Sequence, residues 1–531
     1  MALGTATGDV SEPRSRNVDH DQDASPMPLL PQIRPLTDQA PTDSTQLLAH
    51  AVSLQSAGKF QEAKSILEDL VVIHPARFDV ITLLGIVTAQ SEDYEQALRV
   101  LDVSLRVNPD QAEARNARGV CLVKLERAEA AIESFEQALA LGFLEAHTNL
   151  GTTLTNLGRY EAALDHYQKA LQGAPADPKL YHSQALPLLA LRRFDEALAS
   201  LDHAIDLNPA FAECYYLKAL AHLMLGDFTT GWDLFEWRWR MPEARTDVRR
   251  LRVPLWLGDR VIEGKTILLH AEQGFGDTFQ FCRFVPHVIA LGAKVILEVP
   301  PALTELMASL HPDIEIIARG AHLPRFDLHC PLMSLAKALD LQPNRIPRAP
   351  FYLQPDPQRV AKWKVRLGPR KRPRVGLIWF GSMRGGAANL KSMAFEDMLI
   401  LADTDADFFA LQKQQAPGDE LLYQRSDRIT DLGPELADFA DTAAAMSCLD
   451  LIVSVDTGPA HLACALGRPT WIVLMSQPEW RWPDSHTTPW YPSARLFRQT
   501  IANDWTQPLA AVKAGIQRWL SGDLELPGPE R

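Results

Sequence analysis

Small residues recur along the first half of the chain at a nearly constant interval. An alanine comes three positions after an aromatic residue at Ala63, Ala97, Ala163 and Ala197, and Ala131 keeps the register without the aromatic. Successive alanines are 34, 34, 32 and 34 residues apart. Other residues that follow this period are Pro75, Pro109, Pro175, Pro209, Gly85, Gly119 and Gly151. The pattern predicts pairs of antiparallel helices, because glycine and alanine permit close approach and proline ends the second helix.

Such helical hairpins must stack, because one alone cannot bury its apolar face. We expect five repeats from about 44 to 211 and a sixth, degenerate one that ends near 240, where Gly231 replaces the alanine. The repeats resemble the tetratricopeptide repeat family, which implies an α-solenoid that binds protein partners or forms a homodimer. We interpret the last tryptophans, Trp232, Trp237 and Trp239, as an apolar cap against the next domain, with a ligand platform as the alternative.

From about residue 251, short apolar runs rich in β-branched residues alternate with helical stretches. The predicted strands are KTILLHA, KVILEVP and DIEIIA, and the predicted helices between them are TFQFCRFVPHVIALGA and PALTELMASL. A second series runs through RVGLIWFG, FFALQK, DFADTAAAMSCLD and LIVSVDTGPAHLACALGRPTWIVLM. This alternation predicts parallel βαβ units, and hence two Rossmann-like α/β lobes. Ligands of such sheets bind beyond the carboxyl ends of the strands.

These patterns divide the chain into six segments. They are a disordered leader (1–43), the solenoid (44–240), a first lobe (251–355), a proline-rich basic linker with a short helix (356–373), a second lobe (374–520) and a tail (521–531). The net charge of −13 argues against a general nucleic-acid binder. Six scattered cysteines without a CxxC pair indicate reduced thiols and a cytoplasmic protein. We expect no membrane span and no secretory signal.

A polar turn, DTGPAH, directly follows one apolar strand. Asp456 and Thr457 lie where that strand ends. Pro459 suits the first position of a helix, which makes Gly458 the expected N-cap. The free amides and the dipole of this helix start favour an anion, and a diphosphate would fit there with His461 on the same turn. The alternative is a capped helix with a surface histidine.

This turn, taken with HAEQGFGDTFQF, resembles the heptosyltransferase-type glycosyltransferases of family 9. The order of solenoid and lobes also resembles bacterial relatives of the O-linked N-acetylglucosamine transferases. The resemblance spans nearly all of residues 251–520 and implies the glycosyltransferase B fold, with a nucleotide sugar bound mainly to the C-terminal lobe and neither metal nor cofactor. It implies that Asp456, Thr457, Gly458 and His461 contact the diphosphate and the sugar.

The resemblance also implies a role for the GFGD loop, which contains Gly274 and Gly276. Asp277 matches the acid proposed as the base in heptosyltransferases, and it would take the proton from an acceptor hydroxyl. The alternative is that Asp277 only caps the following helix. The segment EWRWPDSHTTPWYPSARLFRQ is aromatic and basic, and we expect it to pack across the lobes near the cleft.

Four further side chains, three of them basic, complete the predicted donor site. Lys391, next to Ser392, matches the basic residue that precedes a serine in relatives, and it would neutralise the leaving phosphate in place of a metal. Arg384 is a second candidate, in a glycine- and alanine-rich loop that departs from the polar loop of relatives. Gln412 and Lys413 follow a strand and could reach the base or ribose.

The sequence therefore predicts a metal-independent, inverting glycosyltransferase that transfers a sugar from a nucleotide sugar to a protein or glycan acceptor recruited by the repeats. The alternative is a non-catalytic repeat scaffold with a degenerate transferase-like domain, which the altered loop at 381–391 favours. We interpret DTDAD at 403–407 as a solvated turn and not as a metal site.

Overall fold

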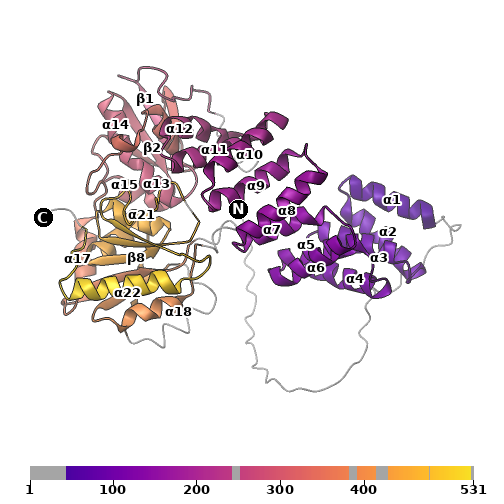
Figure 1. The fold of residues 1–531 in the computed structure, drawn as a ribbon. Coiled ribbons are helices and arrows are strands. Elements are labelled where there is room, and N and C mark those ends of the chain that lie inside the picture. The colour runs from indigo at the N-terminus through magenta and orange to yellow at the C-terminus, as the bar shows by residue number, and fades with distance from the viewer. Residues whose placement is uncertain (1–43, 242–250, 382–390, 414–427, 478, 528–531) are drawn as a thin grey trace, which may run out of the picture. The chain divides into compact units, whose positions relative to one another are not determined.

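A computed structural model describes residues 44–241, 251–381, 391–413, 428–477 and 479–527 (Figure 1). Contacts divide the chain into two compact units, residues 1–142 and 143–531. The division falls inside the array of helical repeats, after its third hairpin. Each unit is described by itself.

The first unit consists of three helical hairpins. Their helices are α1 (Ser44–Ser56), α2 (Phe60–Ile73), α3 (Phe78–Gln90), α4 (Tyr94–Val107), α5 (Ala112–Lys124) and α6 (Ala128–Ala140). Ala63, Ala97 and Ala131 are completely buried. A Cβ atom on Gly119 would lie 2.5 Å from the ring of Phe135, so the repeating glycine is needed where the second helix touches the first. The periodic small residues therefore predict both the hairpins and their contact.

The second unit begins with three further hairpins. Their helices are α7 (Ala146–Asn156), α8 (Tyr160–Gly173), α9 (Pro178–Ala190), α10 (Phe194–Leu207), α11 (Ala212–Met224) and α12 (Phe228–Phe235). The last hairpin is the degenerate one: α12 is short and a 3₁₀ turn, Glu236–Arg240, follows it. A Cβ atom on Gly231 would lie 2.7 Å from the side chain of Leu223, so this glycine takes over the role of the alanine in the other repeats.

The first α/β lobe holds a four-stranded parallel sheet in the order β3-β2-β1-β4. Its strands are β1 (Thr266–His270), β2 (Lys294–Val299), β3 (Ile314–Ala318) and β4 (Leu328–Pro331). Strands β1 to β3 were predicted, whereas β4 was missed. The predicted helix after β1 is broken into α13 (Phe275–Phe281), a 3₁₀ turn and α14 (Val285–Ala290). Pro286 explains the break, because proline has no amide hydrogen for the bond to the preceding turn.

The second lobe holds a six-stranded parallel sheet in the order β10-β9-β8-β5-β6-β7. Its strands are β5 (Arg374–Ile378), β6 (Asp407–Ala410), β7 (Ile429–Asp431), β8 (Leu451–Val455), β9 (Thr470–Leu474) and β10 (Ala494–Arg498). Its helices include α17 (Pro357–Leu367), α18 (Phe395–Met398), α20 (Phe439–Ser447), α21 (Gly458–Ala465) and α22 (Thr506–Leu520). Ile452 and Val453 of β8 belong to different core clusters. Both faces of this central strand are therefore covered, which explains its continuous apolar run.

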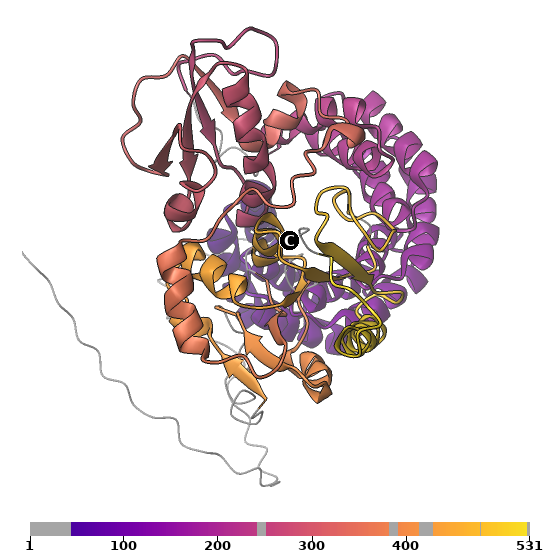
Figure 2. The same cartoon turned by 90° about the vertical axis from the view of Figure 1, so that its left-hand side faces the viewer.

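Within the second unit, the repeats contact both lobes (Figure 2). The ring centroid of Trp232 lies 6.0 Å from that of Phe281 in the first lobe and 5.3 Å from that of Trp480, so Trp232 is an apolar cap, as predicted. Trp237 differs, because it stacks on Tyr215 of α11 at 3.6 Å.

Two hairpin tips reach the second lobe. Gln477 donates a hydrogen bond to the Tyr160 hydroxyl over 2.8 Å, and Arg192 pairs with Asp484. A Cβ atom on Gly158 would lie 2.7 Å from the Cβ atom of Ala502, so the backbone of this tip is in close contact with the lobe.

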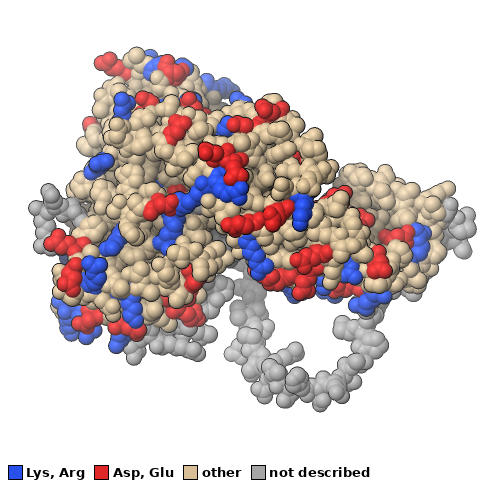
Figure 3. All heavy atoms as spheres, in the orientation of Figure 1, with Lys and Arg blue, Asp and Glu red and all other residues tan. Residues whose placement is uncertain are grey.

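Charged side chains of both signs are interspersed over the face shown in Figure 3. All six cysteines are free thiols. Among the helices of the described ranges, none is both long and apolar enough to cross a membrane.

Candidate functional site

The turn after β8 brings polar groups to the carboxyl edge of the six-stranded sheet. Helix α21 begins at Gly458, and its N-cap is Thr457, one residue before the expected Gly458. The Thr457 carbonyl accepts hydrogen bonds from the amides of Ala460 and His461 at 3.0 and 3.3 Å, so helical bonding starts there. Among the residues that the structure describes, no side chain caps this helix start. Its first-turn amides therefore have no side-chain acceptor, which suits an anion.

Asp456 and Lys391 form an ion pair at this turn. The Lys391 Nζ atom lies 2.6 Å from Asp456 Oδ2, and the Asp456 side chain is only 11% exposed. Burial alone would raise the pKa of Asp456, but Lys391 and His461 outweigh it and hold this pKa well below its usual range. Asp456 in turn raises the pKa of Lys391. Both groups are therefore charged at neutral pH.

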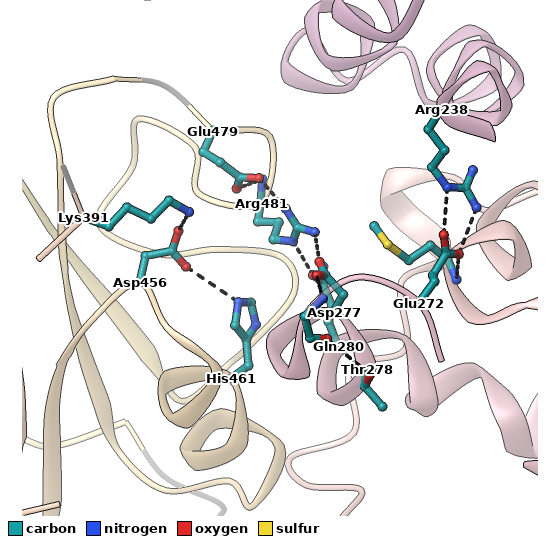
Figure 4. Close-up of polar contacts among 12 residues, drawn as sticks. Arg238, Glu272, Asp277, Thr278, Gln280, Lys391, Asp456, His461, Glu479 and Arg481 are labelled. Carbon is teal, nitrogen blue, oxygen red and sulfur yellow. Dashed lines mark hydrogen bonds and ion pairs between the residues drawn. The ribbon is translucent and has the colours of Figure 1, made fainter. Parts of the chain in front are cut away.

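His461 is buried and not a surface residue, which corrects the alternative interpretation of this turn. Its Nδ1 atom lies 2.8 Å from the Tyr491 hydroxyl, and its Nε2 atom lies 3.7 Å from Asp456 Oδ1. The ring also packs beside Trp482 at 5.2 Å between centroids. These contacts fix the ring between Asp456, beside which Figure 4 shows it, and the segment that carries Tyr491.

Asp277 lies in the first turn of α13, opposite this site. Helix α13 begins at Phe275 with Gly274 as its N-cap, so Asp277 is the third helical residue and not the cap residue expected by the alternative interpretation. It still stabilises the helix start, because its Oδ2 atom accepts a hydrogen bond from the Gly274 amide at 3.0 Å. Its Oδ1 atom accepts one from Arg481. Both carboxylate oxygens therefore have a partner.

Arg481 connects the two lobes at this point, although only its segment, and not the residue itself, was predicted to lie near the cleft. It donates to Asp277 and Gln280 of α13 and pairs with Glu479 (Figure 4). Its guanidinium lies 4.0 Å above the ring of Trp480. Burial would lower the pKa of Arg481, but nearby carboxylates, Glu479 first, raise it more. A role for Arg481 could have been inferred from its position between two tryptophans, in a segment that was expected to cross the lobes.

The lobes meet where α13 and α21 begin. A Cβ atom on Gly276 would lie 2.8 Å from the Cδ2 atom of His461, and one on Gly458 would lie 3.3 Å from the Cβ atom of Phe275. The structure therefore brings Gly276, Asp277, Asp456 and His461 to one region between the lobes.

Gln412, Lys413 and Ser392 bind backbone groups in this structure. Gln412 is buried; it accepts from the Phe380 amide at 3.1 Å and donates to the Phe380 carbonyl at 3.0 Å. Lys413 donates to the Ala437 carbonyl at 2.7 Å. The Ser392 hydroxyl accepts from the Gly381 amide at 3.1 Å. Arg384 lies outside the described residues.

The DTDAD segment is solvated only in part: Asp403 and Asp405 are exposed, whereas Thr404 and Ala406 are buried and Asp407 begins β6. Asp403 pairs with Lys513 at 3.0 Å and Asp405 with Arg372 at 3.1 Å, and these carboxylates are 70% and 82% exposed. Within the described ranges, no group of three or more His, Cys, Asp or Glu residues is arranged to hold a metal.

A second buried ion pair, which was not predicted, involves Glu272, just before the GFGD loop. Arg238, in the 3₁₀ turn that ends the repeats, donates to both oxygens of Glu272 at 3.0 and 2.9 Å. It also donates to Ser334 and pairs with Glu236, at 2.7 and 2.8 Å. The side chains of Arg238 and Glu272 are only 4% and 5% exposed. The last repeat is thus fixed to the loop that leads to Asp277.

Comparison with known protein families finds helical repeats in the first half of the chain and a transferase domain in the second. Residues 408–507 match glycosyltransferase family 9 (heptosyltransferase), and residues 84–142, 144–172 and 183–235 match tetratricopeptide repeats. Protein FlbA of Caulobacter vibrioides is 26% identical over 506 residues, covering 88% of this chain and 83% of that protein.

Solved structures also resemble part of this chain. YrrB, described as a TPR protein with an unusual peptide-binding site, is 22% identical over 34% of this chain and 93% of its own, with a TM-score of 0.29. PilW, described as a type IV pilus biogenesis factor, is 18% identical over 40% of this chain and 100% of its own, with a TM-score of 0.36.

Proposed function

Because the chain carries tetratricopeptide repeats and a C-terminal glycosyltransferase family 9 domain, we propose that it transfers a sugar from a nucleotide sugar to a protein or glycan acceptor. Residues 374–520 would form the donor lobe and residues 251–355 the acceptor lobe. The repeats would recruit the acceptor. The six free cysteines are consistent with a cytoplasmic enzyme.

One observation carries this proposal. The turn with Asp456 and His461 lies against the turn with Gly276 and Asp277, although the two turns belong to different lobes. A transferase needs its donor phosphates and its acceptor base on opposite sides of one reacting carbon, which this juxtaposition would provide.

The roles follow from the chemistry of the groups. Asp277 would take the proton from an acceptor hydroxyl while that oxygen attacks the anomeric carbon. The bond from this carbon to the phosphate oxygen breaks, its electron pair leaves with the nucleoside diphosphate, and the configuration inverts. Lys391 and the amides of Thr457 and Gly458 at the start of α21 would stabilise the charge on the leaving diphosphate without a metal.

A thermal-shift panel with UDP-, GDP-, ADP- and CMP-sugars tests the donor site, because a ligand that binds only the native state raises the melting temperature. We expect one diphosphate sugar to raise it for wild type and for His486→Ala, an exposed histidine nearby, but not for His461→Ala. CMP-sugars carry one phosphate and are the control for the diphosphate. Release of nucleoside diphosphate, abolished by Asp277→Asn, would then demonstrate turnover.

The scaffold alternative rests on a different observation. Lys391 is paired with Asp456, and Arg481 with Asp277, so these cations already have carboxylate partners. A binding panel without any shift in wild type would favour the scaffold. Binding without release of product would favour a donor-binding protein that has lost turnover.

A further inference from the structure

We propose that Arg481 is a switch between the acceptor base and the donor. In the donor-free protein it is paired with Asp277, as observed. When a nucleoside diphosphate sugar binds, Arg481 exchanges this carboxylate for a diphosphate oxygen, and Asp277 is released to accept the proton of the acceptor. This inference rests on the proposed function and adds a positioning residue and an order of events to it.

The observed arrangement explains why Asp277 is inactive before the exchange. Its Oδ1 atom accepts from Arg481, and its Oδ2 atom accepts from the Gly274 amide at 3.0 Å. The side chains of Arg481 and Asp277 are only 13% and 18% exposed, so water competes little with this pair. A general base needs a free oxygen within hydrogen-bond distance of the proton that it takes. Loss of Arg481 from Oδ1 would provide that oxygen.

The surrounding charges explain why a diphosphate would attract Arg481. Six charged side chains gather here: the cations Lys391, Arg481 and Arg498 and the carboxylates Asp277, Asp456 and Glu479. Lys391 and Arg481 are already paired with carboxylates, so an arriving diphosphate must draw them from these partners to be stabilised. The planar fork of a guanidinium suits two phosphate oxygens. A diphosphate carries more charge than one carboxylate and would therefore win the competition for Arg481.

Gln280 provides an independent indication of a ligand. It is completely buried on α13, and its Oε1 atom accepts from the Nε atom of Arg481 at 2.6 Å. Its Nε2 atom is buried and has no hydrogen-bond partner among the described residues. A buried donor without an acceptor is costly. A ligand oxygen beside Arg481 would satisfy this donor, while the bond to Nε would keep the guanidinium close during the exchange.

Calorimetric titration of the full-length protein with UDP, GDP and ADP, each alone, tests the exchange. We expect Arg481→Ala to weaken binding of the preferred nucleoside diphosphate by about 30-fold or more, because a buried charged partner is lost. We expect Asp277→Asn to change affinity in the opposite direction, tightening it by roughly 3- to 10-fold, because Arg481 then leaves a neutral amide. In the double variant the tightening should disappear.

The control is Arg359→Ala. Arg359 also joins the lobes, through Glu305 at 2.6 Å and Asp438 at 3.1 Å, but it lies outside the charge cluster. Loss of these two contacts of Arg359 should leave the affinity for nucleoside diphosphate unchanged. If Arg481→Ala does not fold, Arg481→Gln replaces it in the double-variant comparison, because tightening that survives the loss of Arg481 would come from the removed negative charge and not from the release of Arg481.

Two results would overturn the inference in distinguishable ways. Equal affinity of wild type, Arg481→Ala and Asp277→Asn would refute the switch and leave the proposed function intact. No binding of any of the three nucleotides to wild type would refute the proposed function, and the switch would fall with it.

Discussion

Gly276 of the first lobe lies against the imidazole of His461 in the second, so closely that a Cβ atom would be 2.8 Å from its Cδ2 atom. The ring cannot retreat easily, because Tyr491 and Trp482 hold it. We therefore expect Gly276→Ala to displace the ring, lower the free energy of unfolding by about 1–3 kcal/mol and reduce sugar transfer.

Gly274→Ala is the matched control for this prediction. It lies two residues away in the same loop, where a Cβ atom would meet Asp277 Oδ2 at 3.4 Å and the Gly276 amide nitrogen at 4.0 Å. Chemical denaturation and product release should therefore be near wild type for Gly274→Ala. Equal behaviour of the two variants would show that the contact with His461 is unimportant.

The ion pair of Lys391 and Asp456 should make stability depend on acid pH. Because the pKa of Asp456 is lowered in the folded state, its contribution is complete above the unfolded pKa of about 4 and is lost as pH falls further. Asp456→Asn should lower the free energy of unfolding by about 1–3 kcal/mol at pH 7, and this difference should shrink below about pH 4. Denaturant unfolding at several pH values measures it. Asp405→Asn, which affects an 82% exposed carboxylate, should show almost no difference at any pH.

The pair of Arg238 and Glu272 should be a major stabilising contact of the second unit. Arg238→Met leaves Glu272 buried without its cation, and we expect a loss of about 3–5 kcal/mol. Adding Glu272→Gln removes the uncompensated charge and should restore part of this loss. Arg345→Ala, in a largely exposed pair, should cost less than about 0.5 kcal/mol. If the second substitution worsened the loss, the charge would not be the cause.

Substitution of a glycine in the repeats should destabilise the protein more where less space surrounds it. Gly119→Ala would place a Cβ atom 2.5 Å from the Phe135 ring, and we expect a loss of about 1–3 kcal/mol. Gly173→Ala, at the exposed end of α8 with nothing within 4 Å, should be neutral or slightly stabilising. Circular dichroism melts of the two variants compare them directly.

The sequence predicts the repeats and most strands because their signals are local. A small residue every 34 positions, or a run such as LIVSV, is visible without knowledge of any partner. Strand β4 was missed because it is short and contains a histidine and a proline, and β10 because it lies within an aromatic segment. The shift of the N-cap from Gly458 to Thr457 is a single residue, which local preference cannot decide.

Ion pairs between residues that are far apart in the sequence could not be predicted from local patterns. Arg481 and Asp277 are 204 positions apart, and no spacing rule connects them. The sequence also cannot show which partner a polar residue at a strand end binds. Such a residue can face a ligand or bind a backbone group, and the side-chain amide of Gln412 binds the backbone of Phe380. The predicted roles of the Asp456 turn and of Asp277 remain proposals for the experiments above.

The docking of Trp232, Tyr160 and Arg192 on the lobes has a consequence for how such proteins can be cut and recombined. A boundary drawn where the repeats end would pass through a shared core and expose Phe281 and Trp480 to water. A boundary near Gly142 separates the two compact units instead. In terms of gene rearrangement, we therefore expect the hairpins before Phe143 to be gained or lost more readily than the last hairpin, which shares a core with the lobes.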